Sequence, residues 1–227
     1  KEIAGEKAGI IKDQTPVIIG KKHPDTDPVF IHKAAESQAK VIWAENTTCP
    51  YETDLKGNYQ SENLKTAFAT LQELQKQKPN ILQKHMEKGL LKVQKNTGLR
   101  GRYQQLGASP KIIADTGHNI DAMKWLMAQL QEEDFNQLHM VFGMANDKDS
   151  STILSILPKS AQYYFCKPDV PRGKSEKVLL KEARKHGLTG QCYNSVSDAF
   201  KTAKFEANKN DFIFIGGSTF VVAELEL

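Results

Sequence analysis

The stretch Lys111-Ile-Ile-Ala-Asp115-Thr-Gly-His118-Asn119 decides the fold of this chain. Its apolar, β-prone run ends at Asp115, and after a glycine it leads into an amphipathic run over residues 120–130. This order predicts a strand, a tight turn and a helix, the geometry with which α/β folds bring polar groups to the carboxyl end of a strand. We expect Asp115 and His118 to lie in the turn, where the first helical amides would face an anion, and Asn119 to cap the helix. The alternative is that Asp115 only stabilises the turn.

The same alternation of strand and helix continues along the rest of the chain. The pattern predicts strands at 137–143, 162–166, 191–193 and 211–218, and helices at 150–157, 175–186 and 197–208. Residues 220–227 are expected to add a terminal strand or a short helix. Such a series predicts an α/β fold with a doubly wound, mostly parallel sheet of the Rossmann-like kind.

The first part of the chain is organised differently. Short apolar runs predict strands at 16–19 and 40–43 with a helix at 28–38 between them, which is a βαβ arrangement. A long helix with Leu64, Phe68 and Leu71 on one face is expected to end before Pro79, and a further helix is expected at 81–93. The following segment, residues 94–102, is basic and punctuated by glycines, so we expect two domains, 1–98 and 99–227.

Composition limits the possible functions. The 227 residues are 39% hydrophobic, and the formal charge is only +4, with lysines spread along the chain. We therefore expect no nucleic-acid partner, although anionic small molecules remain compatible with this charge. No apolar run reaches membrane-spanning length and no signal peptide is recognisable, so we expect a cytoplasmic protein without a membrane partner. Cys49, Cys166 and Cys192 have no paired spacing, which favours free thiols over disulfides or a zinc site.

In a parallel sheet, ligand groups collect beyond the carboxyl ends of the strands. These ends are Asp115 with His118, Gly143 with Asn146-Asp147-Lys148-Asp149, Lys167 to Arg172, and Gly216-Gly-Ser218. Lys148 and Arg172 are candidates for a phosphate or a carboxylate, or are merely solvated. Asp147 and Asp149 are expected to be loop and capping residues rather than metal ligands. Gly216 and Gly217 either admit a ligand close to the backbone or only turn the chain.

Several motifs together resemble one family. They are Glu6-Lys-Ala-Gly-Ile-Ile-Lys12, Tyr59-Gln-Ser-Glu-Asn63, Gly101-Arg-Tyr-Gln104, the Asp115-to-Asn119 turn, the Gly143-to-Asp149 segment and Gly217-Ser218. In this order they resemble folylpolyglutamate synthase/dihydrofolate synthase of the Mur ligase superfamily. The resemblance implies that residues up to about Gly98 are the end of a P-loop-type, ATP-binding central domain, and that the rest is the carboxy-terminal domain.

The resemblance also shows what this sequence does not contain. The glycine loop G-x-x-G-K-[GST] of the superfamily is absent, as are the upstream Ser, Glu and His that the family uses as magnesium ligands. Together with a first residue other than Met, this leads us to expect the later part of a longer protein, without ligase turnover of its own. Lys7 matches the family's carbamylated lysine, which implies a catalytic residue whose carbamate is an oxygen ligand for Mg²⁺.

Other site residues of the family match individual residues of this sequence. The resemblance implies that Asn63, Arg102, Asp115 and His118 bind ATP, that His118 is catalytic, and that His118 and Ser218 bind glutamate. Asp-x-Ala-His-Asn-Pro of the family is Asp-Thr-Gly-His-Asn-Ile here, so the proline that would start the helix is missing.

The resemblance implies an ATP-dependent amide ligase. A carboxylate of folate or dihydropteroate would attack the γ-phosphoryl group to give an acyl phosphate, which the amine of L-glutamate would then displace. ATP, L-glutamate, the pterin substrate and Mg²⁺ are the expected partners, and a monomer is expected. Two alternatives stay open, namely a peptidoglycan-precursor Mur ligase and a non-enzymatic nucleotide-binding module. The coding sequence upstream of Lys1 would discriminate between the three.

Overall fold

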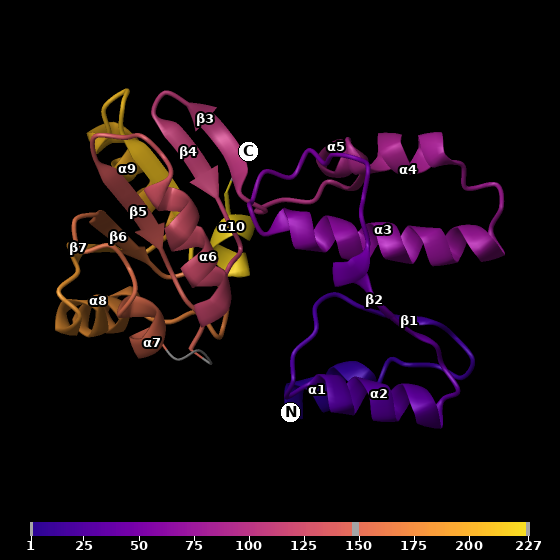
Figure 1. The fold of residues 1–227 in the computed structure, drawn as a ribbon. Helices are drawn as coiled ribbons and strands as arrows, with labels where there is room; N and C mark the ends of the chain where they lie inside the picture. Colours follow the sequence, from indigo (N-terminus) through magenta and orange to yellow (C-terminus); the bar gives the residue numbers. More distant parts are fainter. Residues whose placement is uncertain (1, 147–149, 226–227) are drawn as a thin grey trace. The chain divides into compact units, whose positions relative to one another are not determined.

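The computed structural model describes residues 2–146 and 150–225, which form two compact units (Figure 1). The first unit comprises Lys1–Asp54 and Tyr59–Thr97, and the second comprises Leu55–Asn58 and Gly98–Leu227. The change from one unit to the other between Thr97 and Gly98 lies in the glycine-punctuated basic segment. The short excursion at Leu55–Asn58 has no counterpart in the sequence-based prediction.

The first unit begins with a small βαβ arrangement, as predicted. Its elements are α1 (Glu2–Ala8), β1 (Val17–Ile19), α2 (Asp27–Glu36), β2 (Val41–Trp43) and the short 3₁₀ helix η1 (Ala44–Asn46). The two strands are parallel, with Val17 opposite Val41 and Ile19 opposite Trp43. Three helices follow, α3 (Gln60–Gln77), α4 (Gln83–Leu90) and α5 (Val93–Thr97).

The prediction of one continuous helix over residues 81–93 is wrong. The chain leaves the helix after Leu90 and starts α5 at Val93. Asp54 explains the second start, because its carboxylate accepts hydrogen bonds from the amides of Val93 and Gln94, at 3.0 and 3.1 Å. First-turn amides have no partner inside a helix, so a carboxylate from 39 residues upstream stabilises a new helix there.

The second unit contains a six-stranded sheet. Its strands are β3 (Gln104–Ala108), β4 (Lys111–Ala114), β5 (Leu138–Phe142), β6 (Gln162–Cys166), β7 (Thr189–Tyr193) and β8 (Phe212–Gly216). They lie in the order β3-β4-β8-β5-β6-β7, and all neighbours are parallel except β3 and β4. The predicted mostly parallel sheet is therefore confirmed, while the antiparallel edge strand β3 was not predicted.

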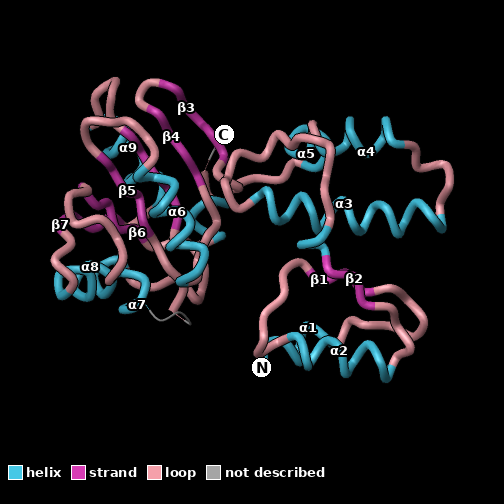
Figure 2. The backbone as a smooth tube through the Cα atoms, viewed as in Figure 1, coloured by secondary structure: helices cyan, strands magenta, loops and turns pink. Residues whose placement is uncertain are grey.

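Helices cover both faces of this sheet (Figure 2). One apolar cluster joins the sheet to α6 (Ile120–Gln131), α7 (Ser150–Leu154) and α8 (Glu176–Lys185). A second cluster joins the opposite face to α9 (Val196–Glu206) and α10 (Thr219–Ala223). Of the two possibilities for the end of the chain, the described residues show a short helix, α10, which ends at Ala223. Because α9 returns the chain to β8 between β4 and β5, the winding direction reverses there, which is where such folds place ligands.

The Leu55–Asn58 segment is bound to α6. The amide of Asn58 donates to Oε1 of the buried Gln129 at 2.9 Å, and its side-chain amide donates to Glu132 at 3.0 Å. Nε2 of Gln129 in turn donates to the carbonyl of Lys56 at 3.3 Å. Gln129 and Glu132 together therefore bind this early segment to the second unit.

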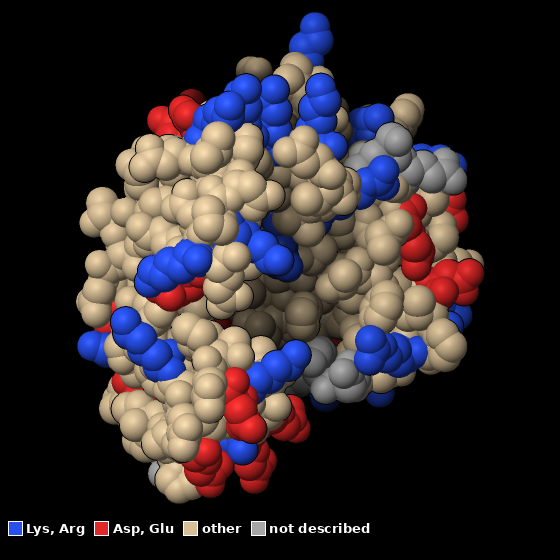
Figure 3. Space-filling view, turned by 90° about the vertical axis from the view of Figure 1, so that its right-hand side faces the viewer, with Lys and Arg blue, Asp and Glu red and all other residues tan. Residues whose placement is uncertain are grey.

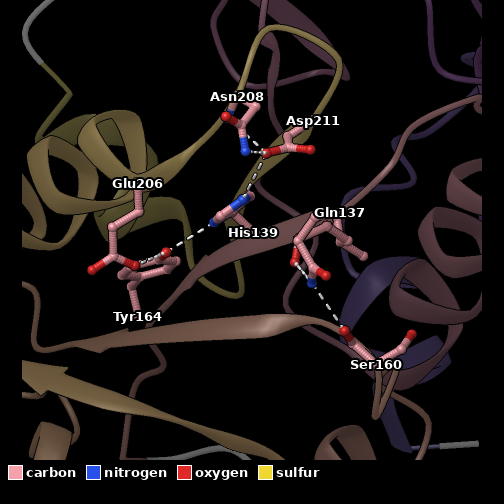
Figure 4. A network of polar contacts seen from close by, with 8 residues as sticks. Gln137, His139, Ser160, Tyr164, Glu206, Asn208 and Asp211 are labelled. Atoms are coloured by element: carbon pink, nitrogen blue, oxygen red, sulfur yellow. Dashed lines mark hydrogen bonds and ion pairs between the residues drawn. The ribbon is translucent and has the colours of Figure 1, made fainter.

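A polar network around the buried His139, Tyr164 and Asp211 lies near the amino ends of the strands (Figure 4). His139 Nδ1 lies 2.8 Å from the Tyr164 hydroxyl, which donates to Glu206 at 2.6 Å, and His139 Nε2 lies 3.4 Å from Asp211. Asp211 also accepts the amide of Asn208 at 2.6 Å. Burial alone would raise the pKa of Asp211, but these hydrogen bonds and the nearby imidazole lower it below its ordinary value.

We expect this network to make stability sensitive to acid. A carboxyl group whose pKa is lowered by folding adds stability above its ordinary pKa, and this contribution is lost as pH falls through the folded value. Asp211→Asn should therefore be less stable than the parent at about pH 6, and the difference should shrink towards about pH 3. Urea denaturation at both pH values measures this, with the exposed Asp134→Asn as control. A difference that stays constant over this range would contradict the assignment.

Candidate functional site

The second unit has a pocket of about 350 Å³ at the carboxyl ends of its strands. It is lined by residues that follow four different strands, namely His118, Ala145, Arg172, Gly217, Ser218, Thr219 and Phe220. The predicted convergence of strand ends is therefore seen for three of the expected side chains, His118, Arg172 and Ser218. Asp147, Lys148 and Asp149 lie outside the described residues.

Asp115 is the central residue of the turn after β4. It is only 2% exposed, and each carboxylate oxygen accepts a backbone amide at 2.7 Å, one from Tyr103 and one from Gly117. These contacts correspond to the alternative in which Asp115 stabilises the turn. Asp115 does not line the pocket, and its ATP contact stays a prediction.

His118 follows this turn and is half-buried at the pocket wall. Its Nδ1 lies 3.0 Å from the carbonyl oxygen of Thr116. Because a carbonyl can only accept, Nδ1 carries the proton and Nε2 is the nitrogen that can accept one. Asn119 caps α6 as predicted, since its Oδ1 accepts the amide of Ala122 at 2.8 Å. This cap provides a helix start that does not depend on the missing proline.

The backbone of the Gly216-Gly217-Ser218 segment lies very close to the backbone of the loops that follow β5 and β4. Gly217 has φ of +88°, and a Cβ there would lie 2.6 Å from the carbonyl oxygen of Gly143. At Gly216 a Cβ would lie 2.7 Å from the carbonyl oxygen of Asp115. Glycine is therefore needed at both positions because the backbone of adjacent loops leaves no room for a side chain, and not only because the chain turns there. The two glycines place Ser218, whose hydroxyl oxygen accepts the amide of Phe220 at 3.2 Å, on the pocket wall.

Arg172 brings a permanent positive charge to the pocket. Its guanidinium carbon lies 4.8 Å from the centre of the Phe220 ring, and the two groups form a cation–π interaction. The backbone is also fixed, because the carbonyl of Arg172 accepts the amide of Asn146 at 2.8 Å and Gly173 pairs with Ala145. Phe220 was not predicted as a site residue, since an aromatic residue at a helix start is typical of a core position and gives no signal for a site.

Three further predicted residues are not among those that line this pocket. Lys7 is exposed in the last turn of α1, and Asn63 is exposed on α3, where its side-chain amide donates to Gln60 at 3.0 Å. Both belong to the first unit, whereas the exposed Arg102 lies in the second, just before β3. Their functional roles stay predictions.

Within residues 2–146 and 150–225, no group of three or more His, Cys, Asp or Glu side chains could hold a metal ion. Cys49, Cys166 and Cys192 are free thiols, as predicted. No helix of the described chain is long and apolar enough to cross a membrane.

Basic residues are concentrated in one segment of the chain, although lysines also occur elsewhere along it. Residues 76–102 contain only Glu87 as an acid and eight basic residues, Lys76, Lys78, Lys84, Lys88, Lys92, Lys95, Arg100 and Arg102. On the face drawn in Figure 3, basic side chains gather along the upper edge, whereas both signs occur elsewhere. The expected absence of a nucleic-acid partner stays a prediction.

Comparison with known proteins agrees with this description. The model of the family "Mur ligase, glutamate ligase domain" matches residues 101–219. A probable bifunctional folylpolyglutamate synthase/dihydropteroate synthase of Haloferax volcanii is 28% identical over 190 residues, which are 83% of this chain and 22% of that protein. The dihydrofolate synthase/folylpolyglutamate synthase of Escherichia coli is 25% identical over 240 residues, 99% of this chain and 54% of that protein.

Solved structures share the fold. A bifunctional folylpolyglutamate synthase/dihydrofolate synthase with Mn, AMPPNP and L-glutamate bound superposes with a TM-score of 0.76 at 24% identity, covering 98% of this chain and 55% of that one. The chain thus spans about half the length of the Escherichia coli protein and of this structure. Because the family match covers more than half of the chain and most of the second unit, the chain belongs to the Mur ligase family, with its glutamate ligase domain in the second unit.

Proposed function

We propose that this chain supplies the glutamate-binding site and part of the nucleotide-binding site of an ATP-dependent ligase that joins L-glutamate to folate or dihydropteroate. The family and the names of the relatives support this proposal. Since the chain spans only part of those relatives, the proposal concerns the share of the reaction that its own residues can carry.

The observation that carries the proposal is the pocket around Arg172, His118 and Ser218. Its volume of about 350 Å³ is within the range of small-molecule sites. L-glutamate carries two carboxylates, and a guanidinium can bind a carboxylate through two parallel hydrogen bonds. The Ser218 hydroxyl accepts a backbone amide, so its own proton remains available for a second contact with the ligand.

The proposed reaction gives His118 a defined task. A carboxylate of the pterin substrate attacks the γ-phosphorus of ATP, ADP leaves, and an acyl phosphate forms. The glutamate nitrogen then bonds to the acyl carbon and phosphate leaves, but this nitrogen must first lose a proton. Because Thr116 holds the proton on Nδ1, Nε2 of His118 is the atom that can accept it.

For the nucleotide, we propose Asn63 and Arg102 as contacts and Asp115 as a residue that acts through the turn. The amide of Asn63 suits a base, and the exposed guanidinium of Arg102 suits a phosphate. Asp115 binds the amides of Tyr103 and Gly117, which directly adjoin Arg102 and His118 in sequence. Its buried carboxylate therefore fixes the backbone of both residues at once.

The divalent metal of the reaction does not fit the described residues alone. Lys7, even as a carbamate, would be a single ligand, and the described residues contain no cluster of three ligand side chains. We therefore propose Lys7 as one contributor to a magnesium site and assign no step of the reaction to metal bound by this chain.

Calorimetric titration with amino acids tests the proposed function. We expect the chain to bind L-glutamate with a dissociation constant on the order of 1 mM, and D-glutamate or L-glutamine more weakly. Arg172→Met should weaken binding at least about tenfold, because it removes a charged hydrogen-bonding partner. Lys177→Met, which replaces an exposed lysine outside the pocket, is the control. Equal affinity for the enantiomers, or no effect of Arg172→Met, would refute the proposed site.

A further inference from the structure

Three polar side chains, the buried Lys174 and Ser150 and the partly exposed Glu182, contact one another in a triangle next to the loop that carries Arg172. Lys174 is 8% exposed, and its ammonium group lies 2.6 Å from the Ser150 hydroxyl and 2.7 Å from the Glu182 carboxylate. The Ser150 hydroxyl donates to the same Glu182 oxygen at 2.6 Å. A buried ammonium is stable only when paired and hydrogen-bonded, so the three groups depend on one another.

The triangle joins three separate segments. Ser150 begins α7, Glu182 lies in α8, and Lys174 lies two residues after Arg172 in the connection from β6 to α8. The amide of Lys174 also donates to the carbonyl of Met144 at 2.8 Å. The end of the Arg172 loop is therefore held to both helices and to the loop after β5.

The part of the same loop before Arg172 is held by a contact that does not involve Lys174, Ser150 or Glu182. The amide of Asp169 donates to Glu224 at 2.6 Å, just after α10, the helix that contributes Phe220. Between the two anchors, Gly173 passes so close to the backbone that a Cβ would lie 2.4 Å from the carbonyl oxygen of Pro168. The loop is thus hydrogen-bonded on both sides of Arg172, whose side chain reaches the Phe220 ring.

We infer that Lys174, through Ser150 and Glu182, is a positioning residue that holds the Arg172 guanidinium over Phe220 at the pocket wall. The inference rests on the proposed function in one respect, namely that Arg172 binds a carboxylate of the ligand. The electrostatics of Glu182 agree with a tight pair, since burial raises its pKa but the hydrogen bonds from Lys174 and Ser150 lower it below the ordinary value. Neither α8 nor the Lys174 side chain lines the pocket, so these residues act through Arg172.

The arginine resonance in the NMR spectrum reports this position without any ligand. A guanidinium over a ring experiences the ring current, so the Nε–H resonance of Arg172, assigned by its loss in Arg172→Lys, is displaced. Phe220→Leu gives the value without the ring. We expect Lys174→Met to move the resonance at least half of the way to this value, and the exposed Lys177→Met to leave it in place.

The outcomes separate positioning from stability. If Lys174→Met lowers the thermal midpoint but leaves the Arg172 resonance in place, the triangle is only structural and the inference fails. Should Lys174→Met not fold, Glu182→Gln keeps the hydrogen-bonding shape while removing the charge, and it should move the resonance in the same direction by less. An unmoved resonance in that variant is equally contrary to the inference. A glutamate titration of the parent tests the proposed function separately, because the resonance requires no ligand.

Discussion

Asp115→Ala is expected to destabilise the second unit by about 3–5 kcal/mol. The change removes two short hydrogen bonds to a charged acceptor and leaves the amides of Tyr103 and Gly117 without their carboxylate partner in a buried turn. Each such bond contributes about 1.5–3 kcal/mol, and buried amides without partners add to the loss. Urea denaturation followed by circular dichroism measures the effect.

Two companion variants sharpen this test. Asp115→Asn retains the shape but presents an NH₂ group to one of the two amide donors, so it should lose about half as much. Asp134→Ala replaces an exposed carboxylate of the same unit and should change stability by less than about 0.5 kcal/mol. If Asp115→Ala were no more destabilising than Asp134→Ala, Asp115 would not be the residue that organises the turn.

Gly217→Ala is expected to cost about 2–4 kcal/mol and to abolish glutamate binding. The φ of +88° is unfavourable for alanine, and its Cβ would lie 2.6 Å from the Gly143 carbonyl oxygen and from the Phe142 ring. The first neighbour is a backbone atom and the second a fully buried ring, so the segment that carries Ser218 would have to move away from them. Thermal unfolding and glutamate titration of the variant measure the two effects.

Gly98 provides a matched control for this substitution. It also has a positive φ, +68°, but a Cβ there would meet nothing within 4 Å. Gly98→Ala should therefore show the backbone cost alone, about 1 kcal/mol, with glutamate binding retained. If both variants lost the same amount of stability and of glutamate binding, the close contacts at Gly217 would not be the cause of the effect.

Residues whose role depends on local sequence were predicted well. The apolar run before Asp115 and the amphipathic run after Asn119 gave a strand, a turn and a capped helix, and the structure has β4, the turn and α6 at these places. The same periodicities gave the parallel sheet. Since parallel strands place their carboxyl ends at one edge, the approach of His118, Arg172 and Ser218 to one pocket followed from the order of the elements.

Features that depend on distant residues were not predictable. Asp54 starts α5 from 39 residues away, and Gln129 binds the Leu55–Asn58 segment across more than 70 positions. The strand β3 has the sequence Gln-Gln-Leu-Gly-Ala, whose weak alternation gives no strand signal, and it exists because β4 offers it a pairing edge. The buried position of Asp115 likewise depends on Tyr103, which lies 12 residues upstream.

The proposed function requires that the pocket of the second unit binds glutamate through Arg172, His118 and Ser218. Titration of the ¹⁵N-labelled chain with L-glutamate, followed by heteronuclear NMR, tests it most directly. We expect the largest shift changes at these three residues and at Phe220, and Arg172→Met should require at least about tenfold more ligand. Shift changes confined to the first unit, or none at the pocket under saturating L-glutamate, would contradict it.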